Sequence, residues 1–191
     1  NNPDPSYHGM VWTEFAKAVG PIAYIVRARF VGLRDLGPAL PPQSAFQIIQ
    51  GLETVSLRME KHCSNAAKVA EYLSNHNKVS RVIYAGLDEG EAGERANKYL
   101  KGGHGALCGI ELKGGKASGE KFINNLNMFY HVANIGDARS LAIHPASTTH
   151  SQLSDEDMES AGVNPSYVRL SIGIEHIDDI IEDLKNALDA A

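Results

Sequence analysis

The sequence lacks the hallmarks of several large classes of protein. It contains only 2 cysteines in 191 residues, Cys63 and Cys108, which excludes a disulfide-rich scaffold. Two free thiols in a reducing cytoplasm fit this usage, with one disulfide between them left open. The chain has no cluster of lysine and arginine and a formal net charge of −5, which argues against a nucleic-acid partner. It has no apolar run of membrane-spanning length, because Arg27 and Arg29 interrupt residues 22–31.

The first residues also lack an initiator methionine. The opening Asn-Asn-Pro-Asp-Pro-Ser-Tyr-His-Gly has neither the charged region nor the apolar region of a secretion signal. We therefore expect a cytoplasmic protein without a membrane partner, and a sequence that is a piece of a longer chain. What the sequence does contain is 43% hydrophobic and 21% charged residues, the proportions of an ordinary globular protein long enough to bury a core.

The first third of the chain has a helical pattern. Residues 12–36 favour a helix that Gly20 and Pro21 break or kink near its middle. A stop follows at the prolines of residues 36–42. A long helix is then expected over residues 44–73, weakened but not ended by Gly51, as a connector between two domains.

From residue 75 onward, short apolar runs alternate with amphipathic segments. The best marked helix has isoleucines and leucines spaced at i, i+3, i+4, i+7 and i+11 from Ile177. The pattern predicts an α/β fold, one sheet with helices packed on a face. The expected strands are 79–84, 106–112, 129–133, 140–144 and 168–172, and the expected helices are 92–100, 118–126, 155–160 and 177–188.

The strand at residues 168–172 carries the clearest candidate for a binding site. Val168, Leu170 and Ile172 alternate with polar residues, which places Arg169 in mid-strand on the more polar face. A guanidinium held on a rigid strand presents a planar fork of donors that suits a carboxylate or phosphate. The alternative is a structural ion pair between Arg169 and an acidic neighbour at the sheet edge.

Three other polar clusters could suggest a phosphate loop, a metal site or a nucleophile, but none has the residue spacing that such a site requires. The glycines of residues 101–109 are not placed between a strand and a helix as in a phosphate-binding loop, so a turn is expected. His144 and His150 match no metal-ligand spacing, and we expect no metal. The hydroxyls of residues 147–149 lack a strained nucleophile turn and favour an ordinary turn or helix cap.

Five segments go further, because together they resemble a known family. They resemble the C-terminal part of the Cys/Met-metabolism family of pyridoxal-phosphate enzymes, and within it the O-acetylhomoserine sulfhydrylase group. The resemblance covers essentially the whole chain, in order and with similar spacing. The segments are residues 3–9, 33–40, 50–62, 134–150 and 168–176.

The resemblance implies both a fold and an activity. Residues 1–57 would be the end of the large cofactor domain with an inter-domain helix. Residues 58–191 would be the small C-terminal domain of the aspartate-aminotransferase-like (type I) fold, a mainly antiparallel sheet with helices on one face. The implied reaction is replacement of acetate by sulfide on O-acetylhomoserine, which gives homocysteine in methionine biosynthesis. The implied assembly is a homotetramer.

The family motifs also imply roles for individual residues. Arg169 matches the arginine of an Arg-Leu-Ser-x-Gly motif that holds the substrate α-carboxylate. Asn134 stands where lyase relatives carry a serine beside that carboxylate, and is expected to bind substrate. Ser140 and Thr149 match motif positions near the site and are expected to play a supporting part. Arg139 stands where several relatives carry a glutamate, which leaves its role open.

One family feature is missing from this sequence. The family's Schiff-base lysine lies in a Ser-x-Thr-Lys segment, and no lysine here stands in one. We therefore expect no catalytic residue and no covalently bound pyridoxal 5'-phosphate in this chain, which would be an inactive fragment that needs the N-terminal half of the same enzyme. The alternatives are a non-catalytic binding or assembly module, or a related enzyme of the cystathionine γ-synthase or γ-lyase type.

Overall fold

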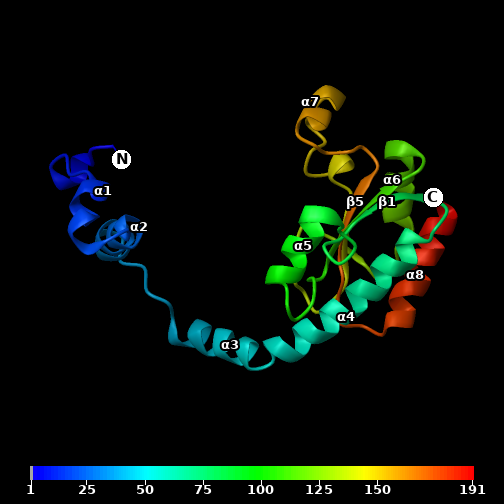
Figure 1. The fold of residues 1–191 in the computed structure, drawn as a ribbon, viewed down its shortest axis with the longest axis horizontal. Helices are drawn as coiled ribbons and strands as arrows, with labels where there is room; N and C mark the ends of the chain where they lie inside the picture. Colours follow the sequence, from blue (N-terminus) through cyan, green and yellow to red (C-terminus); the bar gives the residue numbers. More distant parts are fainter. Residues whose placement is uncertain (1) are drawn as a thin grey trace. The chain divides into compact units, whose positions relative to one another are not determined.

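The computed structural model describes residues 2–191, apart from the side chains of residues 19, 155 and 159. The chain divides into two compact units, a first that ends at Gly51 and a second that spans Leu52–Ala191 (Figure 1). The domain boundary expected near residue 57 stays a prediction. No helix in the described part of the chain combines the length and the apolar character of a membrane span.

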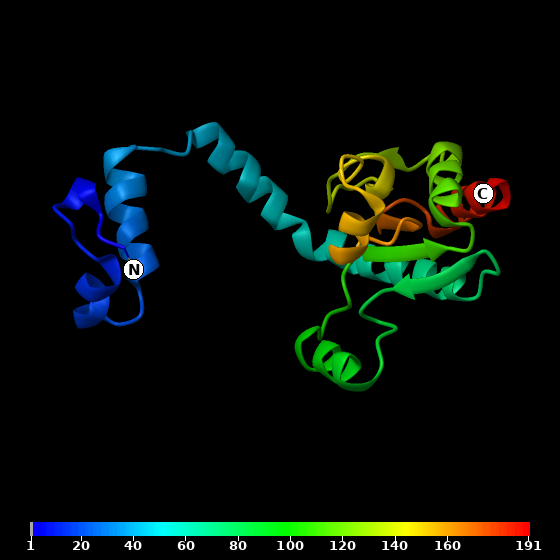
Figure 2. The same ribbon diagram turned by 90° about the horizontal axis from the view of Figure 1, so that it is seen from above.

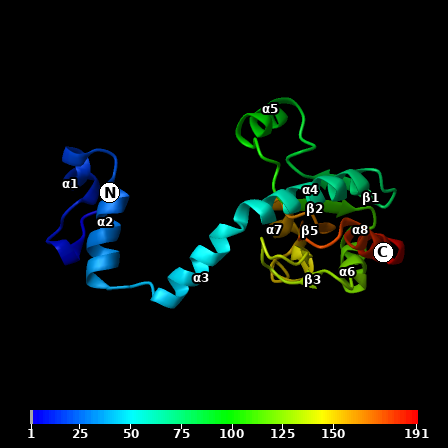
Figure 3. The same cartoon turned by 90° about the horizontal axis from the view of Figure 1, so that it is seen from below.

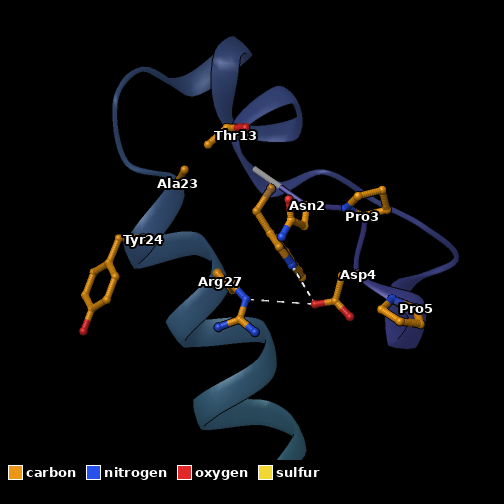
Figure 4. Close-up of a pocket in the computed structure, with 9 residues that line it drawn as sticks. Asn2, Pro3, Asp4, Pro5, Thr13, Ala23, Tyr24 and Arg27 are labelled. Carbon is orange, nitrogen blue, oxygen red and sulfur yellow. Dashed lines mark hydrogen bonds and ion pairs between the residues drawn. The ribbon is translucent and has the colours of Figure 1, made fainter.

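The first unit is built from short helical segments around aromatic side chains. Gly20, with a φ of +94°, separates the segment before it from the one after it, so the expected break is confirmed. Figure 4 shows Arg27 pointing toward the carboxylate of Asp4. Nε of Arg27 lies 4.0 Å from Oδ2 of Asp4, and the indole Nε1 of Trp12 donates to the same oxygen at 2.8 Å. The segments are η1 (Pro5–Tyr7), α1 (Trp12–Phe15), η2 (Ala16–Val19), α2 (Ala23–Arg27), the π-helical η3 (Ala28–Asp35) and most of α3 (Pro42–Glu53), whose last two residues belong to the second unit.

The expectation of one long helix over residues 44–73 is wrong. α3 (Pro42–Glu53) starts two residues earlier, with Pro42 in the first turn. A proline is tolerated there because the backbone N–H that it lacks would have no acceptor within the helix. The chain then leaves the helical conformation at Thr54, with φ −111° and ψ 5°, and resumes as α4 (Val55–Ser74). The β-branched Thr54 is a weak helix former, and the glycine at position 51 does not interrupt α3.

The second unit holds a five-stranded sheet in the order β1-β2-β5-β4-β3. β1–β2, β2–β5 and β4–β5 pair antiparallel, and β3–β4 pair parallel, so the expected mainly antiparallel sheet is confirmed. Figure 2 shows β1 and β2 side by side. All five expected strands are present with shifted ends: β1 (Val79–Ile83), β2 (Leu107–Leu112), β3 (Tyr130–His131), β4 (Leu141–Ile143) and β5 (Tyr167–Ser171).

Three helices pack on one face of this sheet and close the core. α4, α6 and α8 bury apolar side chains against β2 and β5, where Val168, Leu170 and Ile110 are fully buried. Figure 3 shows α5 projecting from the connection between β1 and β2, apart from this layer. The expected helices are confirmed as α5 (Gly90–Tyr99), α6 (Gly115–Asn125), α7 (Asp155–Ser160) and α8 (Ile177–Ala190). We call this side of the sheet the covered face and the other side the open face.

Candidate functional site

Arg169 lies in the middle strand of the sheet and on its open face. In β5 its neighbours Val168 and Leu170 are fully buried on the covered face, whereas Tyr167 and Arg169 are half-buried. Gly109 of β2 and Ile143 of β4 flank Arg169 on the two adjacent strands. The expected alternation is confirmed, and it fixes the direction of the arginine because successive side chains of a strand point to opposite faces.

The guanidinium of Arg169 points toward the loop of residues 134–139, which we call the carbonyl loop. Its Nη2 donates a hydrogen bond of 3.2 Å to the backbone carbonyl of Asn134. In the described part of the chain no acidic side chain forms an ion pair with Arg169, so the sheet-edge ion pair considered above is not formed there. The remaining N–H donors of the fork are not used in any other hydrogen bond among the described residues.

A cavity of about 440 Å³ opens beside Arg169. Its walls come from β1, β2, β4, β5, the end of the β3 segment, and the two loops that precede and follow α7. Arg169 and Thr149 are among the described residues that line it, whereas Asn134 and Ser140 are not. The lining residues are Arg81, Ile83, Glu111, Ala133, Ile143, Pro145, Thr149, His150, Gly162, Val163, Asn164, Tyr167 and Arg169.

Four polar residues that line this cavity were not expected from the sequence: Arg81, Glu111, Asn164 and Tyr167. Strand register places Arg81, Glu111 and Tyr167 in one row across β1, β2 and β5, and Nη1 of Arg81 lies 3.8 Å from Oε1 of Glu111. Tyr167 leans over Gly109, where a Cβ would lie 2.5 Å from its ring. Burial raises the pKa of the Tyr167 phenol above its ordinary value, and the nearby Arg169 acts in the opposite direction. Only Tyr167 had a local signal, two residues before Arg169 on the same face.

Asn134 meets Arg169 through its backbone. Its side-chain Oδ1 accepts a hydrogen bond of 2.9 Å from the N–H of Ile135, and its own N–H donates to the carbonyl of Val132 at 3.0 Å. These local bonds shape the start of the carbonyl loop and orient the Asn134 carbonyl. Asn134 is exposed, and its expected contact with a substrate through the side chain stays a prediction.

Ser140 is fully buried beneath the carbonyl loop. Its N–H and its hydroxyl donate to the two carboxylate oxygens of Glu175, at 2.6 and 2.9 Å. Its Oγ in turn accepts from the N–H of Gly173 at 2.9 Å. The hydroxyl therefore connects the carbonyl loop to the segment that follows β5. A supporting part for Ser140 in binding stays a prediction, and because of these bonds it would act through the loop and not by direct contact with the substrate.

Thr149 belongs to the turn that forms one rim of the cavity. η4 (Pro145–Ser147) leads into it, and the Thr148 hydroxyl donates to the carbonyl of His144 at 2.8 Å, as expected for an ordinary turn. The buried His144 places its Nε2 2.8 Å from the carbonyl of Pro165, and this bond joins the turn to the opposite rim. The exposed Thr149 pairs its Oγ1 with Nδ1 of His150 at 2.9 Å.

The residues around Arg169 do not by themselves fit a covalently held pyridoxal phosphate. That group requires a lysine amine, and none of the described residues that line the cavity is a lysine. Lys78 lies elsewhere, and its Nζ donates to the carbonyls of Leu188, Asp189 and Ala191. The two cysteines are free, and burial raises the pKa of the Cys108 thiol to about 12. The cavity beside Arg169 is therefore suited to hold an anion.

Comparisons with known proteins place this geometry in context. The model of the Cys/Met metabolism PLP-dependent enzyme family matches residues 8–189. The chain is 53% identical over 192 residues to an O-acetyl-L-homoserine sulfhydrylase of Leptospira meyeri, covering 97% of this chain and 43% of that protein. It is 49% identical over 186 residues to O-acetyl-L-homoserine sulfhydrylase 1 of Thermus thermophilus, covering 97% and 44%.

A solved structure shows the same fold. It is an O-acetylhomoserine (thiol)-lyase from Campylobacter jejuni with N'-pyridoxyl-lysine-5'-monophosphate, similar to this chain with a TM-score of 0.79 and 43% identity. The match covers 99% of this chain and 44% of that one. The chain thus spans less than half the length of these relatives.

Proposed function

Because this chain belongs to the Cys/Met-metabolism family of pyridoxal-phosphate-dependent enzymes, we propose that it is the C-terminal part of an O-acetylhomoserine sulfhydrylase. In this proposal the whole enzyme replaces the acetate of O-acetylhomoserine by sulfide and forms homocysteine for methionine biosynthesis. The contribution of this chain is the site that binds the substrate α-carboxylate. The likeness to sulfhydrylases of 53% and 49% identity supports the sulfhydrylase over the cystathionine γ-synthase or γ-lyase type.

The observation that carries the proposal is the placement of Arg169. Its guanidinium lies on the Asn134 side of the sheet, beside a cavity large enough for an amino acid, with one hydrogen bond made to a neutral carbonyl. No acidic partner among the described residues competes for it. A planar fork with free donors binds a carboxylate in two parallel hydrogen bonds, which gives orientation as well as affinity. Asn134 and Thr149, at the loop and the cavity rim, are the proposed neighbours of the bound carboxylate.

The cofactor would be held by residues outside this chain. Pyridoxal phosphate supplies an electron sink for bond cleavage next to the amino group of its substrate. This chain orients the substrate through Arg169. The lysine that anchors the cofactor is proposed to lie in a part of the full-length enzyme outside this chain, which corresponds to the region of the relatives that the chain does not cover. The 191-residue polypeptide alone should therefore show no visible absorption band after incubation with pyridoxal phosphate and removal of the excess. A retained band would contradict this division of roles.

The decisive experiment uses the full-length protein and replaces Arg169. Arg169→Ala should raise the KM for O-acetylhomoserine by about a hundredfold, because a charge-assisted pair of hydrogen bonds contributes roughly 2–3 kcal/mol. Arg169→Lys should recover part of the loss, since an ammonium keeps the charge without the fork. The matched control is Arg95→Ala, an exposed arginine of α5 that pairs with Glu91. Homocysteine formation at an unchanged KM in Arg169→Ala would remove the arginine from its role.

The alternative function is a binding or assembly module without catalysis. It is supported by the cavity lining, in which none of the described residues is a lysine. It predicts no homocysteine formation from the full-length protein. We also propose that the parent enzyme is a cytoplasmic homotetramer. The two free thiols support the reducing compartment, and sedimentation of the full-length protein tests the assembly.

A further inference from the structure

We propose that Glu175 is a positioning residue that sets the orientation of Arg169 through Ser140 and the carbonyl loop. The inference rests on the proposed carboxylate-binding role of Arg169. Arg169 itself is fixed at its backbone by two neighbouring strands, but its long side chain is directed by one hydrogen bond, to the carbonyl of Asn134. The direction of the guanidinium therefore depends on where the carbonyl loop holds that oxygen.

The carbonyl loop has no helix or strand of its own and is held by discrete bonds. Near its middle, the N–H of Gly136 donates to the Ser171 hydroxyl at 3.1 Å. Near its end, the carbonyl of Ala138 accepts from the N–H of Ile174 at 2.9 Å. Loop residues 134–136 are exposed, so little apolar burial adds to these bonds. The strongest attachment follows directly, where Ser140 meets Glu175.

The Glu175 carboxylate is placed to hold both donors of one residue. Its two oxygens accept the N–H and the O–H of Ser140, and charged acceptors make stronger hydrogen bonds than neutral ones. In the described part of the chain Glu175 forms no ion pair. The hydrogen bonds of its carboxylate there are the two that it accepts from Ser140. A glutamine in its place would offer one acceptor and one donor, and the Ser140 hydroxyl would lose its acceptor.

Glu175 is in turn held at its backbone by a side chain of α4, one of the helices that pack on the covered face. Nδ2 of the buried Asn65 in α4 donates to the carbonyls of Gly173 and Glu175 at 3.0 and 2.9 Å. Gly173 has no room for a side chain, because a Cβ would lie 2.2 Å from Oε2 of Glu175 and 2.5 Å from the N of Ser140. Hydrogen bonds therefore run from α4 through Glu175 to Ser140, and the backbone of the carbonyl loop connects Ser140 to the Asn134 carbonyl that directs Arg169.

The test is a double-mutant cycle in the full-length enzyme. Glu175→Gln should raise the KM for O-acetylhomoserine about tenfold and leave kcat within about twofold, since one charge-assisted bond is lost at a distance from the reaction. In an Arg169→Ala background the same change should alter KM by less than about twofold, because the group that Glu175 positions is gone. Ser140→Ala should follow the same pattern. The matched control is Glu182→Gln, an exposed acid of α8.

Two results would overturn the proposal. One is an unchanged KM in Glu175→Gln, and the other is an equal tenfold rise in both backgrounds, which would indicate a general structural effect. Circular dichroism and the melting temperature show whether each variant folds. If Glu175→Gln does not fold, the milder Ser140→Ala completes the cycle.

A binding measurement separates this proposal from the proposed function. Calorimetry compares L-homoserine with 3-amino-1-propanol, the same molecule without its carboxylate, on the full-length protein. Glu175→Gln should reduce the preference for homoserine about tenfold, and a preference equal to that of the unsubstituted protein would overturn the positioning role. If the unsubstituted protein prefers homoserine but forms no homocysteine from O-acetylhomoserine, the proposed reaction fails while the positioning role is still measured.

Discussion

The two faces of β5 differ in almost everything except their backbone. On the covered face, Val168 and Leu170 are fully buried against α4, α6 and α8. On the open face, Tyr167 and Arg169 stay half-buried beside a cavity. Burial of apolar area is the main source of folding free energy. The covered face therefore stabilises the strand, and the open face can carry Arg169, a charged side chain with one hydrogen bond to a neutral carbonyl. The predictions below test whether stability depends on the covered face and binding on the open face.

The largest difference should appear in the chemistry of a thiol on the covered face. Burial raises the pKa of the Cys108 thiol from its ordinary value of 9.0 to about 12, which lowers its thiolate fraction at pH 8 by about a thousandfold. In a Cys63→Ser variant, Ellman's reagent should therefore label Cys108 at least about a thousandfold more slowly in the folded protein than in urea. Rapid labelling in the folded state would mean that the covered face opens readily.

Shortening a side chain of the covered face should give the next largest effect. Leu170→Ala removes a fully buried side chain at the centre of the sheet and should lower the free energy of unfolding by about 2–5 kcal/mol. Urea denaturation followed by circular dichroism measures the change. A loss below about 1 kcal/mol would show that the helix layer closes around the gap.

Two glycines sharpen the comparison further. Gly173→Ala should cost about 1–3 kcal/mol, because the new Cβ would lie 2.5 Å from the N of Ser140 and 2.6 Å from the carbonyl oxygen of Ala138, and backbone atoms cannot rotate away. Gly109→Ala should cost less than about 1 kcal/mol, because the three atoms nearest to the new Cβ all belong to the outer end of the Tyr167 side chain, which can turn into the open cavity. Equal losses in urea denaturation would contradict this reasoning.

The smallest effect on stability should come from the binding residue itself. Arg169→Ala removes one exposed hydrogen bond to the Asn134 carbonyl and should change the free energy of unfolding by less than about 0.5 kcal/mol. The same substitution is expected to have the largest effect on substrate binding. A loss of several kcal/mol would show that Arg169 is a structural residue.

The sequence was sufficient where the pattern is local. The alternation in β5 predicted which of its side chains are buried. The five-position pattern from Ile177 in α8 was predictive in part, because Ile180, Leu184 and Leu188 are fully buried whereas Ile177 and Ile181 are half-buried. The interruption at Thr54 was missed because neighbouring residues keep the helical pattern on both sides of it. A single residue outside the helical conformation leaves little trace in such a pattern.

The site was predictable only in part for the same reason. Arg169 and Thr149 were expected and do line one cavity. Arg81 and Glu111 could not be assigned to it, because register between strands far apart in sequence is set by the whole sheet. Ser140 was expected near the site on a motif, but its burial under the loop and its bonds to Glu175 depend on tertiary contacts 35 residues apart.

The order of the strands has a consequence for how the second unit folds. Among the five strands of this sheet β5 is the last along the chain, yet it stands at the centre, and β2 and β4 are connected only through it. Until the ribosome has released this segment, the earlier strands form two separate halves with unpaired inner edges, which are prone to join other chains. Assembly of the sheet therefore waits for β5, and the cavity beside Arg169 forms only when the two halves are joined.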